Sequence, residues 1–346
     1  MSAYAELCRQ LKQQPRRWMV TGAAGFVGSN LVEALLKLDQ NVVGLDNFSN
    51  GFSYNVDDIR ANVSAAQWSR FQFVDGDARD PEACRRSVEG ADCVLHQAAL
   101  GSVPRSIADP WSSHDSNVNG QMQILLAARD AKVKRVVYAS SSSVYGDHPG
   151  LPKVEDRIGD PLSPYAATKR VNELYADVMA RTYGMSIAGL RYFNVFGRRQ
   201  NPIGAYAAVI PTWFAALRKS LPIEIFGDGE TSRDFCYIAN VVQANLLAGS
   251  VETLPRPHEV FNVAAGAQTS LKDLFELIRA QVALLYPEAA DAQPVYRAFR
   301  PGDVRHSLAD VSKAERLLGY VPTHGVDVGI AETASWYLDP NCPAVQ

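Results

Sequence analysis

Paired cysteines are what this sequence most clearly lacks. Its five cysteines are odd in number and scattered over 346 residues, without a C-x-x-C pair: Cys8, Cys84, Cys93, Cys236 and Cys342. A disulfide framework or a cysteine-based zinc site needs regularly spaced cysteines, so neither is indicated. The pattern fits a reducing compartment, and we expect a cytoplasmic location.

Long apolar runs and an excess of one charge are also missing. No stretch approaches the roughly 20 apolar residues that cross a bilayer, and the formal net charge is -3 with a pI near 6.1. The sequence therefore predicts no membrane span and no nucleic-acid partner. Residues 1–17 are not a signal peptide, because apolar residues recur there at helical spacing among charged ones. We expect an amphipathic helix on the domain surface, with an oligomer contact as the alternative.

What is present is an alternation of strands and helices. Residues 18–193 alternate apolar strand patterns with helical ones, which predicts a doubly wound parallel α/β sheet of the Rossmann type. Residues 194–346 predict a smaller α+β lobe for substrate, with some chain returning to the sheet. In this second part we expect strands at 223–226 and 260–263 and helices at 205–217, 239–247, 271–284 and 312–318.

A glycine-rich turn follows the first strand pattern. Trp18–Thr21 is a short apolar strand, and Gly22, Gly25 and Gly28 come directly after it, ahead of a helical pattern at Ser29–Leu38. Such glycines let the backbone approach a pyrophosphate, and the helix N-terminus supplies unpaired N–H groups and positive potential. A glycine triplet alone is a weak signal, because many are ordinary turns. The following strand supplies the context.

A carboxylate closes the second strand pattern. Asn41–Leu45 is an apolar strand that ends in Asp46, close to the spacing of about 20 residues expected for an acid on the ribose of a dinucleotide. Because Asp46 would repel the additional phosphate of NADP, NAD is the expected cofactor. The alternative is that Asp46 is a helix N-cap or a turn residue.

Two further strand patterns end in small or polar residues. Phe71–Val74 precedes Asp77–Ala78, and Cys93–His96 precedes Gln97–Ala99. The carboxyl ends of parallel strands line the ligand crevice, so the first pair suits the adenine edge of a dinucleotide and the second group suits its middle. Within the second strand, His96 is expected to be a hydrogen-bonded strand residue, because no other ligand stands at metal spacing.

A serine run closes the fifth strand pattern, Arg135–Ala139. Each hydroxyl of Ser140–Ser143 needs a partner or water at a strand end, which indicates a site. Tyr165 and Lys169 stand four residues apart in a helical stretch at 161–183, so both side chains emerge on one face, where they can do proton chemistry. This helix and a second one at 117–131 flank one side of the sheet. Their apolar residues either pack on that sheet or form a dimer interface.

Taken together, these features resemble one family. The glycine spacing, Asp46, the serine-rich strand end, Tyr165-x-x-x-Lys169 and the run Leu190-Arg191-Tyr192-Phe193-Asn194 resemble the extended short-chain dehydrogenase/reductases that act on nucleotide sugars. The resemblance covers nearly the whole chain. It is closest to bacterial UDP-N-acetylglucosamine 4-epimerases of surface-polysaccharide (O-antigen) synthesis, through residues 97–106, 204–211 and 227–235, and it implies a homodimer through the two flanking helices.

The resemblance implies a role for each matched residue. Tyr165 would take the proton from the C4 hydroxyl of the sugar, Lys169 would hold the nicotinamide ribose and tune Tyr165, and Ser141 would shuttle or orient the proton. The implied NAD contacts are Gly22, Gly25, Phe26, Val27, Gly28, Asp46, Asn47, Asp77, Ala78, Gln97, Ala98, Ala99, Asn117, Tyr165, Lys169 and Tyr192. The implied contacts to the UDP-sugar are Ser102, Ser141, Ser142, Ser143, Tyr165, Asn194, Ala208, Val209, Ile225, Arg233, Arg300, Asp303 and Ser307.

The tyrosine needs help to act as a base. A free tyrosine has a pKa near 10, so lowering it by about 3 units takes roughly 4 kcal/mol of preference for the phenolate. A cation about 6 Å away contributes on the order of 3 kcal/mol at an effective dielectric of 20. We therefore expect Lys169 and the positive nicotinamide to be needed together.

Two positions after Ser141 separate the possible reactions. Related dehydratases have Asp-Glu there, because elimination of water needs an acid and a base, and related decarboxylases have Ser-Glu; this chain has Ser142-Ser143. Epimerisation is therefore favoured over the alternative of a dehydratase or decarboxylase. Ser307 stands where relatives limited to UDP-glucose and UDP-galactose have a tyrosine, so space for an N-acetyl group is expected. A non-catalytic NAD-binding regulator is a further alternative, disfavoured by the intact Tyr165 and Lys169.

Overall fold

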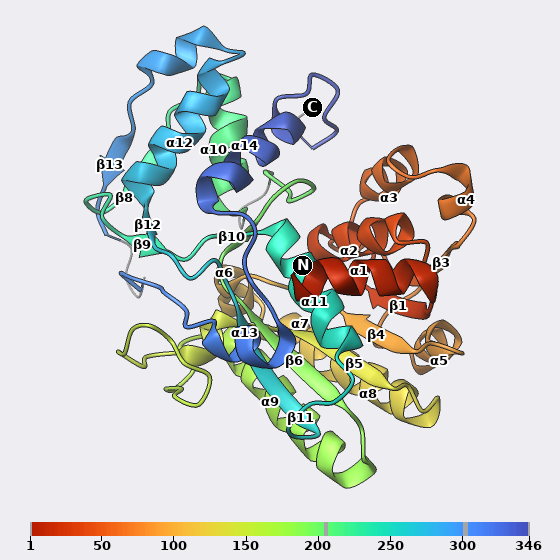
Figure 1. Cartoon of the computed structure of the whole chain (residues 1–346). Coiled ribbons are helices and arrows are strands. Elements are labelled where there is room, and N and C mark those ends of the chain that lie inside the picture. The colour runs from red at the N-terminus through yellow and green to blue at the C-terminus, as the bar shows by residue number, and fades with distance from the viewer. Residues whose placement is uncertain (1, 204–206, 300–303, 345–346) are drawn as a thin grey trace.

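The centre of the molecule is a parallel sheet of seven strands. The computed structural model describes residues 2–203, 207–299 and 304–344. The strands pair in the order β11-β6-β5-β4-β1-β2-β3, every pair parallel (Figure 1). Their bounds are β1 Arg17–Thr21, β2 Asn41–Asp46, β3 Phe71–Asp75, β4 Cys93–His96, β5 Arg135–Ser141, β6 Ile187–Tyr192 and β11 His258–Val263. The doubly wound sheet predicted from the sequence is confirmed, and the strand order reverses between β1 and β4.

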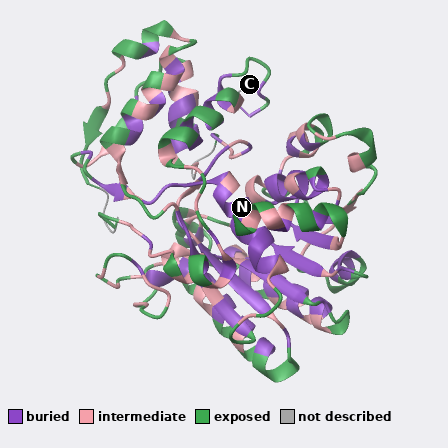
Figure 2. Ribbon diagram, viewed as in Figure 1, coloured by how far each residue is buried: buried purple, intermediate pink, exposed green. Residues whose placement is uncertain are grey.

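Helices cover both faces of this sheet, and each face has its own apolar core. On one face lie α1 (Ala3–Gln13), α2 (Phe26–Lys37), α3 (Ser53–Ala61), α4 (Ala65–Trp68) and α11 (Ile238–Ser250), and on the other lie α5 (Pro81–Val88), α8 (Gly120–Asp130) and α9 (Pro164–Tyr183). Helix α1 packs against α11 and buries Leu7 and Leu11. Apart from the edge strand β3, the strands of the sheet are largely buried, while the outer sides of the helices are exposed (Figure 2). No helix in the described ranges is long and apolar enough to cross a membrane.

The chain after residue 193 divides its elements between the sheet and a smaller lobe. The lobe stands at the carboxyl edge of the sheet (Figure 1). Its elements are β7 (Val195–Phe196), α10 (Val209–Arg218), β8 (Glu224–Phe226), β9 (Ser232–Arg233), β10 (Cys236–Tyr237), β12 (Thr269–Ser270), α12 (Leu271–Ala283), β13 (Val295–Arg297) and α14 (Val326–Tyr337). Helix α11, strand β11 and α13 (Ser312–Leu318) return to the main sheet. Helix α14 was not expected from the sequence, and α10 begins at Val209 rather than at the predicted 205.

Short helical segments connect the strand ends that surround the pocket. They are α6 (Val103–Ala108), α7 (Pro110–His114), a π-helical turn at Asp115–Asn119 and a 3-10 turn at Ser142–Tyr145. Serines 140 and 141 complete β5, and the 3-10 turn begins directly afterwards. Helix α9 starts with the side chain of Ser163 accepting the N–H of Ala166 and with Pro164 in its first turn. The end of β5 and the start of α9 therefore meet at the same edge of the sheet.

Candidate active site

A cavity of about 580 Å³ lies at the carboxyl ends of β1, β2, β4 and β5, within the size range of ligand pockets. It spans the switch point between β1 and β4, where doubly wound sheets bind their ligands. Of the expected cofactor contacts, all but Asn117 line it. Asn117 lies directly behind the wall, where its side chain accepts the N–H of Leu100 (2.8 Å) and donates to the hydroxyl of Thr168 (3.1 Å).

The glycine turn leaves no room for side chains. Gly22 has a φ of +66°, and a Cβ on Gly28 would stand 2.0 Å from the carbonyl oxygen of Gly22. Gly25 is the N-cap of α2 and has no side chain to occupy the first N–H groups of the helix. Together with Phe26 and Val27, these backbone groups face the cavity. The turn therefore fits the pyrophosphate of a dinucleotide.

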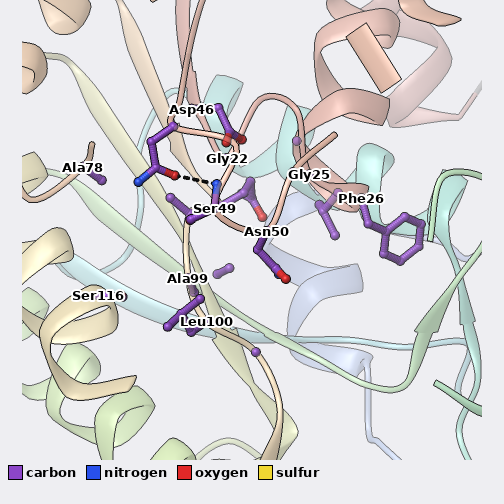
Figure 3. A pocket seen from close by; sticks show the side chains of 18 of the residues that line it. Gly22, Gly25, Phe26, Asp46, Ser49, Asn50, Ala78, Ala99, Leu100 and Ser116 are labelled. Atoms are coloured by element: carbon purple, nitrogen blue, oxygen red, sulfur yellow. Dashed lines mark hydrogen bonds between the residues drawn. The ribbon is translucent and has the colours of Figure 1, made fainter. Parts of the chain in front are cut away.

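Asp46 shapes this turn and also lines the cavity (Figure 3). Its two carboxylate oxygens accept the N–H groups of Ala24 (2.9 Å) and Phe48 (2.8 Å). Burial raises the pKa of Asp46, and the backbone hydrogen bonds oppose that rise. The two alternatives from the sequence, a ribose ligand and a turn residue, are therefore compatible, since each carboxylate oxygen can accept a second hydrogen bond.

The adenine side of the pocket is closed by charged and polar side chains. Asn47 donates to Asp77 (2.8 Å), and Asp77 forms an ion pair with Arg79 (2.6 Å). Arg79 reaches on to Asp115 (2.6 Å), so these groups form one connected rim. Arg79 was not expected from the sequence, although it directly follows Asp77-Ala78. Other unexpected lining residues include Ser49, Asn50, Leu100 and Ser116 (Figure 3). Val195 and Gln200 also line the cavity.

Gln97 and Tyr192 are held by a buried asparagine. The hydroxyl of Tyr192 donates to Gln97 (2.8 Å), Asn245 donates to that hydroxyl (2.8 Å), and Gln97 donates back to Asn245 (3.0 Å). His96 is a hydrogen-bonded strand residue, as expected: its Nδ1 lies 2.8 Å from the hydroxyl of Thr21. That hydroxyl also accepts the N–H groups of the two residues after His96. It therefore donates its own proton to Nδ1, and the wall at the end of β4 is fixed.

Tyr165, Lys169 and Ser141 meet at the other end of the cavity. The ammonium of Lys169 donates to the carbonyl oxygen of Ala139 (2.9 Å) and lies 5.9 Å from the ring centre of Tyr165. Burial lowers the pKa of Lys169 to about 8. Burial also raises the pKa of Tyr165, and a hydrogen bond from Ser141 offsets only part of that rise. Burial therefore outweighs the hydrogen bond from Ser141, and the pKa of the phenol stays above its usual value.

The four serines of the run have different surroundings. Ser140 is buried, and its hydroxyl donates to Glu173 (2.7 Å), which leaves it unavailable as a proton shuttle. The hydroxyl of Ser141 accepts the N–H of Ser143 (3.1 Å) and contacts Tyr165. The hydroxyl oxygen of Ser143 is buried and finds no hydrogen-bond partner in the described part of the chain. Only Ser141 thus combines cavity exposure with contact to the tyrosine.

The residues expected around the UDP-sugar come from scattered segments. Ser141 and Tyr165 are the only described members of this set that line the cavity. Ser102 caps α6, and the carbonyl oxygen of Asn194 accepts the N–H of Cys236. Ala208 and Val209 lie at the start of α10. Arg300 and Asp303 lie outside the described residues. Ile225 is fully buried in the core, where its side chain packs with other apolar residues.

Two segments of the lobe lie against each other near these residues. Arg233 donates to the carbonyl oxygens of Ser232 (2.9 Å) and Arg305 (3.2 Å). The N–H of Ser307 donates to the carbonyl oxygen of Ser232 (3.1 Å), and the N–H of Ala309 donates to Asp234 (3.1 Å). Residues 232–234 therefore hold the segment that follows residue 303.

The fold and the site define an α/β protein of the dinucleotide-binding class, with a tyrosine, a lysine and a serine gathered at one end of the pocket. A family model described as the NAD dependent epimerase/dehydratase family matches residues 18–264. The chain belongs to this family, the extended short-chain dehydrogenase/reductases, and its cofactor is NAD.

Similar proteins are UDP-sugar 4-epimerases. A UDP-glucose 4-epimerase of Mycolicibacterium smegmatis is 36% identical over 323 residues, covering 93% of this chain and 98% of the relative. The structure of a UDP-N-acetylglucosamine 4-epimerase from Methanobrevibacter ruminantium M1 is 34% identical, with a TM-score of 0.85 over 94% of this chain and 98% of that one. The UDP-glucuronic acid 4-epimerase from Bacillus cereus, solved with UDP-glucuronic acid and NAD, is 30% identical, with a TM-score of 0.81 over 93% and 99%.

Proposed function

We propose that this protein interconverts UDP-N-acetylglucosamine and UDP-N-acetylgalactosamine by transient oxidation at C4. The observation that carries the proposal is the meeting of Tyr165, Ser141 and Lys169 at one end of a dinucleotide pocket whose serine run has no carboxylate. Uronic acid forms of the same sugars, and more weakly UDP-glucose, are further candidate substrates. Relatives acting on UDP-glucose, UDP-glucuronate and UDP-N-acetylglucosamine support the reaction class.

The chain's own residues divide the work. The glycine turn and Asp46 would hold NAD, which when bound would supply the acceptor and donor for the hydride of C4. Tyr165 removes the proton of the C4 hydroxyl and returns it, and Ser141 orients that proton. Lys169, fixed on the carbonyl oxygen of Ala139, holds the nicotinamide ribose and favours the phenolate. The UDP part of the substrate stays bound while the hexose rotates to present its other face to the cofactor.

The absence of an acid decides between inversion and elimination. Ser143 stands where dehydratases and decarboxylases need a glutamate, and its hydroxyl is buried beside Ser141. Ser142 and Ser143 directly follow Ser141, which lines the cavity, and are proposed to contact the sugar there.

The lobe is proposed to hold the UDP. Arg233, Arg300 and Asp303, with Asn194, Ala208 and Val209, are assigned to the nucleotide, and arginines suit a pyrophosphate as charge-assisted donors. Ser307 is small and lies on the segment attached to Ser232. It leaves space for an N-acetyl group at the rim of the sugar site.

A homodimer through α8 and α9 is part of the proposal. Helix α9 exposes Leu174, Tyr175 and Val178, each about half accessible, and grouped exposed apolar side chains mark interaction surfaces. A symmetric pair would bury this stripe against its own copy. Leu174→Glu is expected to shift the protein from dimer to monomer in analytical ultracentrifugation. A dimer of unchanged stability would place the interface elsewhere.

The test is direct. The purified protein is incubated separately with UDP-N-acetylglucosamine, its uronic acid and UDP-glucose, and the epimers are quantified. The fastest conversion is expected for an N-acetylated substrate. No cofactor needs to be added, because NAD is expected to stay bound through turnover. Formation of a dehydrated or decarboxylated product, or no conversion of any of the three, would refute the proposal.

A further inference from the structure

Three turns of α9 are attached to three consecutive residues of β5. Tyr165, Lys169 and Glu173 follow one another at intervals of four residues, so their side chains share one face of the helix. The hydroxyl of Ser141 contacts Tyr165, the carbonyl oxygen of Ala139 accepts from Lys169 (2.9 Å), and the hydroxyl of Ser140 donates to Glu173 (2.7 Å). The third attachment has no part in the proposed chemistry.

Glu173 is charged, buried and fully paired. Arg191 of β6 donates from Nε and Nη2 to the two oxygens of the Glu173 carboxylate, both at 2.8 Å. The two side chains are only 2% and 3% exposed. Arg191 also donates to the carbonyl oxygen of Glu155 (2.9 Å), and its guanidinium lies 4.8 Å from the ring centre of Tyr145. Geometry of this kind makes an ion pair directional.

The network holds both ends of the serine run. Ser140 opens the run and is bonded to Glu173. Tyr145 follows the run, lies against Arg191, and donates its hydroxyl to Asn262 (2.6 Å). Ser141 therefore sits on a segment that is tied to α9 before it and to the Arg191 guanidinium after it.

A buried ion pair is a weak source of stability, because desolvation offsets most of its attraction. Apolar contacts between α9 and the sheet, such as those of Ala176 and Met179, are non-directional and fix the helix less sharply. Hydrogen bonds to charged groups are directional, so they fix the position of α9 on the sheet more sharply. The network thus specifies a helix position more than it supplies free energy of folding.

We propose that Glu173, together with Ser140 and Arg191, is a positioning group that sets the side chain of Tyr165 against Ser141. The inference rests on the proposed function, in which Tyr165 is the base. Glu173 acts only through the helix and strand that it joins.

Ser140→Ala tests the network with the smallest change, because it leaves the Glu173–Arg191 pair intact. We expect kcat to fall about 10-fold, the scale of a lost hydrogen bond to a charged group, with KM and NAD content within twofold of wild type. The pH at which the rate is half-maximal should rise, since Ser141 then lowers the pKa of Tyr165 less. Ser87→Ala is the matched control: Ser87 is fully buried on α5, its hydroxyl donates to the carbonyl oxygen of Ala83 (2.7 Å), and it is not among the residues that line the cavity.

A second variant removes all three groups at once; Arg170, which also pairs with Glu173 (3.4 Å), is about one-third exposed and keeps its charge in contact with solvent. Ser140→Ala, Glu173→Leu and Arg191→Met are combined, because apolar side chains of similar volume replace a buried pair with little loss of stability. We expect a folded, NAD-loaded protein with kcat reduced at least 10-fold. A kcat and pH profile equal to those of the Ser87→Ala control, in either the single or the triple variant, would overturn the inference.

Tyr165→Phe, measured in parallel, separates a failure of the positioning role from a failure of the proposed function. If Tyr165→Phe is inactive and Ser140→Ala is slow with a shifted pH profile, both the base and its positioning group are supported. If Tyr165→Phe is inactive while Ser140→Ala behaves as the control, the positioning role alone fails. Wild-type turnover by Tyr165→Phe would overturn the proposed function, and the positioning role with it.

Discussion

The cofactor side of the pocket and the proposed sugar site are built in different ways. On the cofactor side, the lining residues directly follow strands of one sheet and are tied to each other by short hydrogen bonds, such as the triangle of Gln97, Tyr192 and Asn245. On the sugar side, the assigned residues come from β5, α9, α10 and the segments around 233 and 307, joined largely through backbone groups. In the proposed function, one cofactor is reused while the sugar rotates, and this difference would give a fixed cofactor site beside a more permissive sugar site.

The largest expected effect on turnover comes from Tyr165, which lies between the cofactor side of the pocket and the proposed sugar site. Tyr165→Phe should lower turnover on every UDP-sugar by about 10³-fold, the usual scale for loss of a general base, while NAD remains bound. Initial rates with each sugar and the NAD content of the purified variant are the measurements. Wild-type turnover would remove Tyr165 from the mechanism.

Gly28→Val should prevent NAD binding without affecting the folding of the lobe. A Cβ at this position would approach the carbonyl oxygen of Gly22 to 2.0 Å, so the start of α2 must move away from the turn. The variant should purify without NAD and lose most of its activity, as measured by cofactor release after denaturation. The matched control is Gly184→Ala, where a Cβ meets nothing within 4 Å although φ is +66°. Retention of NAD by Gly28→Val would show that the pyrophosphate is not held on this turn.

The cofactor side was largely predictable because its determinants are local. Gly22, Asp46 and Gln97 each follow an apolar strand within a few residues, and parallel strands bring their carboxyl ends together whatever the rest of the chain does. Asn245 escaped prediction because it lies on a later helix and reaches the pocket only through contacts remote in sequence. Glu173 escaped because a helical glutamate looks like an exposed one until its partner Arg191 is placed.

The sugar site was predicted only through family resemblance, and of its described residues only Ser141 and Tyr165 line the cavity. The side chain of Ile225, for example, is buried in the core. Short strands such as β8 have little periodicity from which to read a buried face. Helix α14 went unrecognised for a similar reason, since its pattern follows a proline- and glycine-containing loop near the end of the chain.

Ser307→Tyr should narrow the range of sugars that the proposed sugar site accepts. A bulky ring on the segment held by Ser232 is expected to fill the space proposed for the N-acetyl group. Activity on N-acetylated sugars should fall at least 10-fold more than activity on UDP-glucose, measured as kcat/KM ratios. Equal losses on both substrates would exclude Ser307 as the residue that admits the acetamido group.

The last variant concerns the pH dependence of stability in the lobe, where no effect on the reaction itself is predicted. Asp234 is fully buried, and burial raises its pKa to about 6 although backbone N–H groups bond it. Because the folded-state pKa lies above the unfolded value, its contribution is fully present below about pH 4 and is lost as the pH rises through 6, by roughly 3 kcal/mol in all. The difference in unfolding free energy between wild type and Asp234→Asn should therefore change between pH 4 and 7. A difference that does not vary with pH would mean that Asp234 titrates normally.

One measurement addresses transient oxidation at C4 most directly. UDP-N-acetylglucosamine carrying deuterium at C4 is converted in ordinary water, and the product is examined by mass spectrometry and NMR. Full retention of deuterium at C4 of UDP-N-acetylgalactosamine is the predicted result, because the hydrogen leaves and returns without meeting solvent. Loss of the label to water would contradict it.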